Sequence, residues 1–320
     1  MTELWKLTAR EAVAMLRRRE VSPLELIDAA EGRIGAVDPL VNALPTRCFE
    51  RARAHAQRIM ASGAPRNTEA GYLYGLPIVV KDLSAVEGVR WTEGSRVYAH
   101  RVAARSDIVV ETLEANGAIV IAKSNTPEFG AGGNTVNEVF GATLNPWDTR
   151  LTSGGSSGGS AVALATGESW LATGTDMAGS IRYPSAFCSV VGLRPSPGRV
   201  AHGPRNLCFS TFSVDGPMAR NVADVALMLD AMVGAHPEDP LSLARPAIPY
   251  SSAVADALRE PRKGLRVAWS PDLGVAPLDP EVRRICSEAV RSFERAGATL
   301  AEDCPDMREA NTAFYVLRNM

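Results

Sequence analysis

The sequence lacks the features that mark several large classes of protein. Its 320 residues contain no stretch of about 18 uninterrupted apolar residues, so no membrane-spanning helix is expected. The first residues carry acidic side chains and no apolar core segment, so they do not resemble a secretory signal. A net charge of −2 and an aromatic content of 6% argue against a nucleic-acid groove or a polybasic membrane face. We therefore expect a cytoplasmic protein that binds neither membrane nor nucleic acid directly.

Cysteine and histidine are scarce and scattered. No two of the five cysteines form a CxxC pair, which predicts reduced thiols rather than a disulfide framework: Cys48, Cys188, Cys208, Cys286 and Cys304. Cys188 is expected to pack in the core. The four histidines form no HxxxH or HxH pair, so neither a metal nor another cofactor is expected.

Common catalytic and phosphate-binding motifs are also missing. The Gly/Ser-rich residues 152–160 are not followed by Gly-Lys-Ser/Thr, so a P-loop is excluded and only a phosphate cradle of another kind stays open. No GxSxG elbow surrounds Ser180. His202, the nearest histidine to Ser180, lies among glycine and proline, so a Ser-His-Asp triad has little support.

The N-terminal part is expected to be helical. Thr8 with Glu11, and Ser22 with Glu25, have the spacing of capping boxes. The apolar spacing then predicts one helix over residues 21–34, and an Arg- and Ala-rich stretch predicts another over residues 48–61.

Short apolar runs at residues 75–82 and 117–123 are typical of buried strands, and a helix is expected between them, over residues 106–115. Strand, helix and strand are expected again over residues 265–269, 279–297 and 298–301, and a helical run over residues 310–318. This alternation predicts an α/β fold with a mixed central sheet flanked by helices on both faces.

The middle of the chain combines small and apolar residues. Residues 151–203 interleave glycine and serine with Val, Leu, Ile and Phe, which favours buried backbone over a flexible linker. Small residues precede Ser180, so backbone N–H groups can crowd its hydroxyl as an oxyanion hole requires. Lys81 ends an expected buried strand, where a desolvated lysine loses its proton readily and can act as a base.

Five spaced motifs together resemble the amidase-signature family: GLPIVVKD, KSNTPEFG, NPWD, GGSSGG and GTDMAGSIRYPSAFCSVVGLRPS. The resemblance runs from about residue 11 to about residue 234. The spacing between Ser156 and Ser180 is 24 residues, as the family pattern expects. The resemblance implies the amidase-signature fold and a Ser–cis-Ser–Lys triad, in which Ser180 attacks an amide carbonyl, Ser156 relays the proton and Lys81 accepts it.

The resemblance also implies supporting roles. Backbone N–H groups of Met177, Ala178, Gly179 and Ser180 would form the oxyanion hole. The main chain of Gly130 would contact substrate together with Ser156, and Asp176 with Arg182 would form an ion pair that fixes the nucleophile loop.

The same residues have plainer interpretations. Ser156 and Ser180 could each be a helix N-cap, Ser157 is the residue most easily confused with Ser156, and Lys81 could be a surface lysine at a strand end.

Two features depart from the family pattern. Met177-Ala178 stands where relatives commonly have Thr or Ile followed by Gly, which would strain the chain only if φ at Ala178 were positive. Family members are usually longer, so we expect a chain truncated at its C-terminus. Its organisation would be one amidase-signature domain over residues 1–320, with a helical segment at 1–65 and a catalytic core at 70–235.

These observations predict an amidase that hydrolyses a carboxylic amide to an acid and ammonia or an amine, and a homodimer is a further expectation. The glutaminase subunit of a tRNA-dependent amidotransferase, which shares these motifs, is one alternative. An inactive remnant that acts as a binding or scaffold protein is the other.

Overall fold

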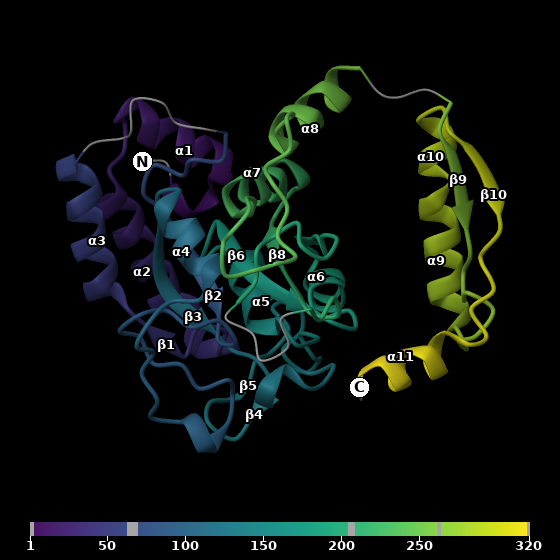
Figure 1. Cartoon of the computed structure of the whole chain (residues 1–320), viewed down its shortest axis with the longest axis horizontal. Coiled ribbons are helices and arrows are strands. Elements are labelled where there is room, and N and C mark those ends of the chain that lie inside the picture. Colours follow the sequence, from purple (N-terminus) through teal and green to yellow (C-terminus); the bar gives the residue numbers. More distant parts are fainter. Residues whose placement is uncertain (1–2, 63–69, 204–208, 261–263, 319–320) are drawn as a thin grey trace. The chain divides into compact units, whose positions relative to one another are not determined.

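The computed structural model describes residues 3–62, 70–203, 209–260 and 264–318. Tertiary contacts divide the chain into two compact units, Met1–Val254 and Ala255–Met320 (Figure 1). The first unit contains every residue for which the sequence predicts a role in the site. The organisation as one domain stays a prediction.

The first unit is built on a mixed sheet, as predicted. Its strands are β1 (Thr46–Arg47), β2 (Leu76–Lys81), β3 (Ala118–Ser124), β6 (Leu171–Asp176), β7 (Val191–Gly192) and β8 (Val214–Ala219). Their order is β1-β3-β2-β6-β8-β7. Strands β3, β2 and β6 are mutually parallel, while β1, β8 and β7 pair antiparallel to their neighbours. A separate small hairpin joins β4 (Val136–Asn137) to β5 (Gly141–Ala142).

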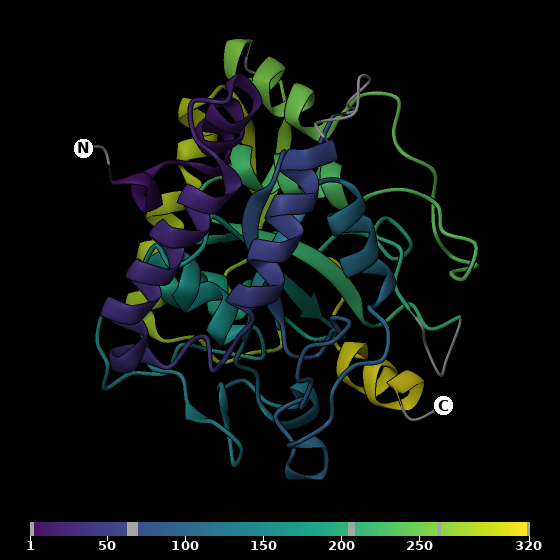
Figure 2. The same ribbon diagram turned by 90° about the vertical axis from the view of Figure 1, so that its left-hand side faces the viewer.

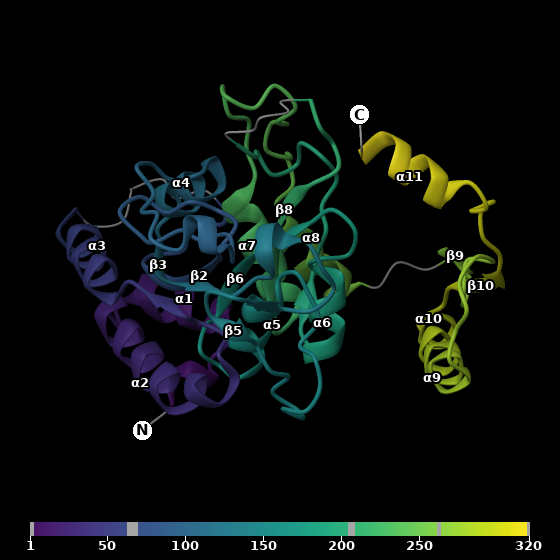
Figure 3. The same ribbon diagram turned by 90° about the horizontal axis from the view of Figure 1, so that it is seen from below.

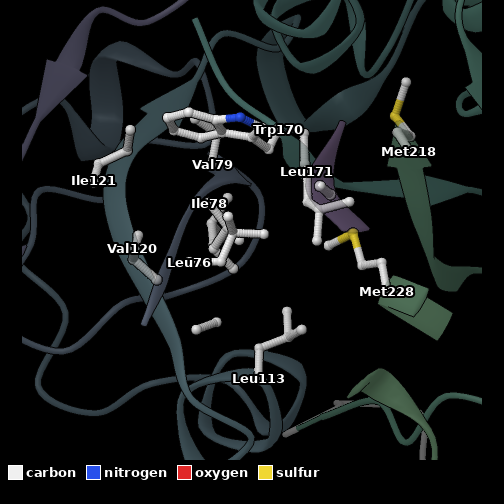
Figure 4. Packing of buried hydrophobic residues seen from close by; sticks show 14 of the residues in the cluster. Leu76, Ile78, Val79, Leu113, Val120, Ile121, Trp170, Leu171, Met218 and Met228 are labelled. Atoms are coloured by element: carbon white, nitrogen blue, oxygen red, sulfur yellow. The ribbon is translucent and has the colours of Figure 1, made fainter. Parts of the chain in front are cut away.

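Helices cover both faces of this sheet. Helices α2 (Pro23–Val41) and α5 (Gly158–Ala165) lie on one side of β3, β2 and β6, and α4 (Ile108–Ala115) and α7 (Val222–Met232) lie on the other (Figure 3). Every residue of β2, β3, β6 and β8 is therefore buried, which explains why two of these strands are continuous apolar runs in the sequence. Figure 4 shows their side chains converging with Leu113 of α4 and Met228 of α7.

The N-terminal helices begin where the sequence predicts. Helices α1 (Ala9–Arg18) and α2 both start with a complete capping box, and α3 (Phe49–Ser62) follows β1. Figure 2 shows these N-terminal helices in purple and blue. Helix α2 runs seven residues past its predicted end, because Asp38 and Val41 are buried in the packed unit. Tertiary packing here overrides the local signals that suggested an earlier stop. Short 3₁₀ turns lie at Leu4–Lys6, Arg96–Tyr98 and Glu128–Gly130.

The second unit contains the late elements that the sequence predicts. Strands β9 (Arg266–Trp269) and β10 (Thr299–Glu302) pair in parallel, and α11 (Ala310–Arg318) follows them. The one helix expected before β10 is divided into α9 (Pro280–Val290) and α10 (Ser292–Arg295). Helix α8 (Tyr250–Arg259) crosses the boundary between the units.

Two findings concern membrane-spanning helices and disulfides. No helix in the described part of the chain is long and apolar enough to cross a bilayer. Cys48, Cys188, Cys286 and Cys304 are free thiols, while Cys208 lies outside the described residues. Cys188 is fully buried, and burial raises the pKa of its thiol to about 12, so it packs as an apolar side chain.

Candidate active site

Lys81 lies at the end of β2, and its side chain is completely buried. Its Nζ atom is 2.6 Å from Ser156 Oγ and 2.8 Å from Thr175 Oγ1. Its backbone N–H donates to Thr173 Oγ1. Residues 173 and 175 are two apart in β6, so their side chains lie on the same face of the strand. Their two hydroxyls therefore hold the backbone N–H and the Nζ atom of Lys81.

A second buried lysine shows what is unusual about Lys81. Lys123 on β3 forms a buried ion pair with Asp82, with 2.8 Å between Nζ and Oδ1. Lys81 has no carboxylate within ion-pair distance among the described residues and contacts only hydroxyls. Burial therefore lowers the pKa of Lys81 to about 7, although the charges of Asp215 and Asp176 act in the opposite direction. A substantial fraction of Lys81 is consequently neutral near neutral pH.

Ser156 reaches Lys81 from a tightly packed turn before α5. The bond between Gly155 and Ser156 is cis, which agrees with the resemblance. A Cβ on Gly155 would lie 2.9 Å from Asn134 N and from Gly132 O, so only glycine fits there. The N-cap of α5 is Ser157. The hydroxyl of Ser156 is therefore not used to cap the helix and is available to Lys81.

Ser180 lies in the loop between β6 and α6 (Arg182–Cys188), and it is half-buried. Its carbonyl oxygen accepts a hydrogen bond of 3.0 Å from the N–H of Ser157. This bond ties the Ser180 loop to the residue that follows Ser156. No described residue forms a hydrogen bond with the Ser180 hydroxyl, so this hydroxyl keeps its proton and lone pairs available.

Asp176 organises the backbone around Ser180. Its buried carboxylate accepts the N–H groups of Gly179 (2.8 Å) and Ile181 (3.1 Å), and it pairs with Arg182 at 3.0 Å. Burial opposes ionisation of Asp176, but the hydrogen bonds from Arg182, Gly179 and Ile181 outweigh it and hold its pKa below the usual value. The Asp176–Arg182 ion pair expected from the resemblance is present.

The four N–H groups expected to form an oxyanion hole divide into two sets. The N–H of Gly179 is already engaged by Asp176. Those of Met177, Ala178 and Ser180 have no acceptor within the part of the chain that the structure describes. Ala178 is not among the residues with positive φ, so its methyl group causes no backbone strain.

Gly130 is placed against the same site. It has φ of +68°, and it follows Phe129, which has φ of 52°. A Cβ on Gly130 would lie 2.6 Å from Leu83 Cδ1 and 3.5 Å from Ser156 Oγ. Gly130 is therefore favoured by its positive φ and by the clash that a Cβ would make with Leu83, whereas the Cβ would only touch Ser156 Oγ.

Sequence reasoning missed two components of this arrangement. Thr175 was not singled out. Thr173 and Thr175 are two residues apart ahead of Asp176, a spacing that could have indicated two hydroxyls on the same face of a strand. The Asp82–Lys123 pair was also missed, because its partners lie 41 residues apart in sequence. Among the described residues, no group of three or more His, Cys, Asp and Glu could hold a metal ion.

Comparison with known proteins identifies the class to which this arrangement belongs. The family model described as Amidase matches residues 25–319. The chain therefore belongs to the amidase family. An acylamidase of Rhodococcus erythropolis is 41% identical over 98% of this chain. A glutamyl-tRNA(Gln) amidotransferase subunit from Moorella thermoacetica is 39% identical over 98% of this chain.

Solved structures agree. A bacterial aryl acylamidase of the amidase signature family superposes with a TM-score of 0.87 at 29% identity, covering 96% of this chain and 64% of the aryl acylamidase chain. A 6-aminohexanoate cyclic dimer hydrolase superposes with a TM-score of 0.84 at 30% identity, covering 95% of this chain and 61% of that chain. The predicted fold is thereby confirmed. The chain spans 65% and 64% of the length of the two curated relatives.

Proposed function

We propose that the protein is an amidase that hydrolyses a carboxylic amide to an acid and ammonia or an amine. The observation that carries this proposal is the buried Lys81, which lies 2.6 Å from Ser156 Oγ and has no carboxylate partner within the described residues. An amine held in this way has a lone pair for the Ser156 proton and little tendency to stay charged.

In the proposed reaction, Ser180 Oγ attacks the amide carbonyl while its proton passes to Ser156 Oγ and the Ser156 proton passes to neutral Lys81. The tetrahedral intermediate collapses when the C–N bond breaks, the leaving amine takes a proton from Ser156, and Lys81 returns its proton to Ser156. Water then attacks the acyl carbon while its proton passes through Ser156 to Lys81, and the C–O bond to Ser180 breaks as Ser180 takes that proton back through Ser156 and the acid leaves. Thr175 Oγ1 accepts one N–H of Lys81 throughout, which orients the lone pair toward Ser156.

The oxyanion of the intermediate would be bound by the N–H groups of Met177, Ala178 and Ser180. Asp176 holds the neighbouring N–H groups of Gly179 and Ile181, so it fixes the loop without competing for these three donors. Loss of one such donor in an enzyme typically raises the barrier by about 3–4 kcal/mol. The proposal gives the main chain of Gly130 a role in binding substrate beside Ser156.

The test is covalent labelling with a fluorophosphonate, followed by intact-mass analysis. The Ser180 Oγ–P bond would form as the P–F bond breaks, with fluoride leaving and the serine proton passing to Lys81. We expect a single adduct on the natural chain and none on Ser180→Ala. Absence of an adduct on the folded natural chain would contradict an activated Ser180 and support the inactive remnant.

A second candidate function is the glutaminase subunit of a tRNA-dependent amidotransferase. It is favoured by relatives such as the Moorella thermoacetica protein, which is named as part of a glutamyl-tRNA(Gln) amidotransferase and is 39% identical. The two functions differ in substrate, because the glutaminase would release ammonia from glutamine. Comparison of glutamine with simple aliphatic and aryl amides as substrates of the same preparation discriminates between them.

The proposal also includes the cellular setting. We place the enzyme in the cytoplasm, acting on a small amide with no direct nucleic-acid or membrane partner and no cofactor, and we propose a homodimer. Light scattering coupled to size-exclusion chromatography tests the dimer, and a mass of 34.1 kDa would contradict it.

A further inference from the structure

A cavity of about 650 Å³ in the first unit adjoins the proposed catalytic residues. Three of its lining residues connect it to them. Thr175 accepts a hydrogen bond from Lys81 Nζ, the side chain of Leu83 occupies the space that a Cβ on Gly130 would need, and Phe129 is the residue before Gly130. The cavity therefore lies beside a residue that is hydrogen-bonded to Lys81 and next to the chain segment that leads into Gly130.

One wall of the cavity carries a cation whose charge is compensated. Arg101 pairs with Glu93 at 2.7 Å. Its guanidinium group also stacks over the rings of Trp91 (3.5 Å) and Tyr98 (3.8 Å). With its charge paired and its planar group fixed between aromatic rings, Arg101 acts as part of the wall and leaves this side of the cavity electrically neutral.

Another part of the lining carries an anion that has no cation at ion-pair distance among the described residues. Asp107 precedes α4 and is half-buried, yet its side chain neither caps the helix nor forms an ion pair with a described residue. His202, which also lines the cavity, contacts the buried carboxylate of Asp215. This part of the lining therefore brings the carboxylate of Asp107 close to a His202 imidazole that is already in contact with a second carboxylate.

A partly buried carboxylate that forms no ion pair with a described residue is poorly stabilised. Burial raises the pKa of Asp107 to about 6, and Asp215 acts in the same direction, while a hydrogen bond from the Ala85 N–H and the charges of His202 and Lys123 act against this shift. Asp107 is thus mostly ionised at neutral pH, and a cation that enters the cavity would compensate its charge in surroundings less polar than water.

We propose that this cavity binds the ammonium group of the substrate, with Asp107 as its counterion, so that the preferred amides carry a basic amino group. This proposal rests on the proposed amidase function. It names Asp107 as the residue that determines specificity for amides with a basic amino group. The aliphatic or aromatic part of such a substrate would lie along Phe129 and Leu83.

The experiment measures binding without turnover. The full chain carrying Ser180→Ala is titrated calorimetrically with ω-amino amides of increasing chain length, each paired with a neutral alkyl amide of the same number of heavy atoms. We expect at least one ω-amino amide to bind about tenfold more tightly than its neutral partner, as charge-assisted hydrogen bonds allow. Equal Kd values for every pair overturn the proposal.

Substitution then assigns the preference to one residue. Asp107→Asn removes the charge and keeps a good N-cap residue, and Asp107→Ser does the same with a smaller side chain. Either folded variant should lose the roughly tenfold preference. Glu111→Gln, an exposed change in the same helix, is the control of equal charge and should keep it. A preference that survives both Asp107 changes overturns the proposal.

This measurement is separate from the test of the proposed function. Ser180→Ala cannot form an acyl-enzyme, so a retained preference together with no fluorophosphonate adduct on the natural chain contradicts the amidase reaction and leaves the ammonium site in place. An adduct without any preference contradicts the ammonium site alone.

Discussion

At the scale of single residues, the two buried lysines decide what the site can do. Lys81 and Lys123 lie on neighbouring strands, and both are inaccessible to solvent. The carboxylate of Asp82 pairs with Lys123, whereas Lys81 meets the hydroxyls of Ser156 and Thr175. An ammonium group needs a counterion when it is buried and a neutral amine does not, so the same residue type serves structure at one position and can serve as a base at the other.

This difference predicts the pH dependence of Ser180 labelling. The pKa of Lys81 is lowered from 10.5 to about 7 by burial, and only its neutral form can accept a proton. The labelling rate should therefore fall about tenfold per pH unit below pH ~7 and reach a plateau above it. Rates of fluorophosphonate labelling, measured by intact mass from about pH 5 to pH 9, check this.

Substitution of Lys81 should lower the labelling rate, whereas substitution of Lys123 should lower the stability of the fold. Lys81→Ala should lower the labelling rate about 100-fold or more with little change in Tm, because it removes a base. Lys123→Ala should cost about 3–5 kcal/mol of stability, because it leaves Asp82 buried and unpaired. A well-folded Lys81→Ala protein that is labelled as fast as the natural chain would contradict the proton relay.

At the scale of elements, the connection from α5 to β6 holds a buried acid. Glu168 is fully buried, and its Oε2 atom is 2.5 Å from Thr166 Oγ1, which is itself 2.8 Å from the carbonyl oxygen of Val162. The single hydroxyl proton of Thr166 can serve the Val162 carbonyl if Glu168 is protonated and donates to Thr166. Burial raises the pKa of Glu168 to about 8, which agrees with this arrangement.

The raised pKa predicts how stability depends on pH. The folded chain holds the Glu168 proton up to pH about 8, while the unfolded chain releases it near 4.5. Stability from this residue is therefore fully present below pH 4.5 and is lost as the pH rises to about 8, at up to about 1.4 kcal/mol per pH unit. Glu168→Gln should flatten this part of the profile and raise Tm at pH 8. The exposed change Glu111→Gln is the control, and parallel Tm profiles for both variants and the natural chain would contradict the prediction.

At the scale of the whole molecule, the two units differ in how they are stabilised. All residues of β2, β3 and β6 are buried under helices on both faces. Within the second unit, the residues of β9 and β10 are at most half-buried. Burial of apolar surface is the main source of stability, so the first unit should be the more stable of the two.

Hydrogen exchange measured by mass spectrometry should show this difference directly. Amides of β2, β3 and β6 should exchange only through global opening, whereas those of β9 and β10 should exchange through local opening and hence much faster. Equal protection in both sheets would contradict the prediction and would indicate that β9 and β10 are covered by another surface.

Local chemistry determined a large part of this protein. The capping boxes at Thr8 and Ser22 and the apolar runs that became β2 and β3 depend on neighbours in sequence, and they appear where the sequence predicted them. The expectation that Ser156, Ser180 and Lys81 act together came from a resemblance of spaced motifs. It stays a prediction until Ser180 is labelled.

Only the tertiary structure decided which groups meet. Lys81 and Thr175 are 94 residues apart, and Asp82 and Lys123 are 41 apart, so no local pattern shows that one lysine is paired and the other is not. Strands β6 and β8 were missed because their sequences, LATGTD and VDGPMA, contain glycine and polar residues and lack the continuous apolar run that identified β2 and β3. The lowered pKa of Lys81, the engagement of the Gly179 N–H and the lack of an ion pair between Asp107 and any described residue all follow from burial and distance, which exist only once the chain is folded.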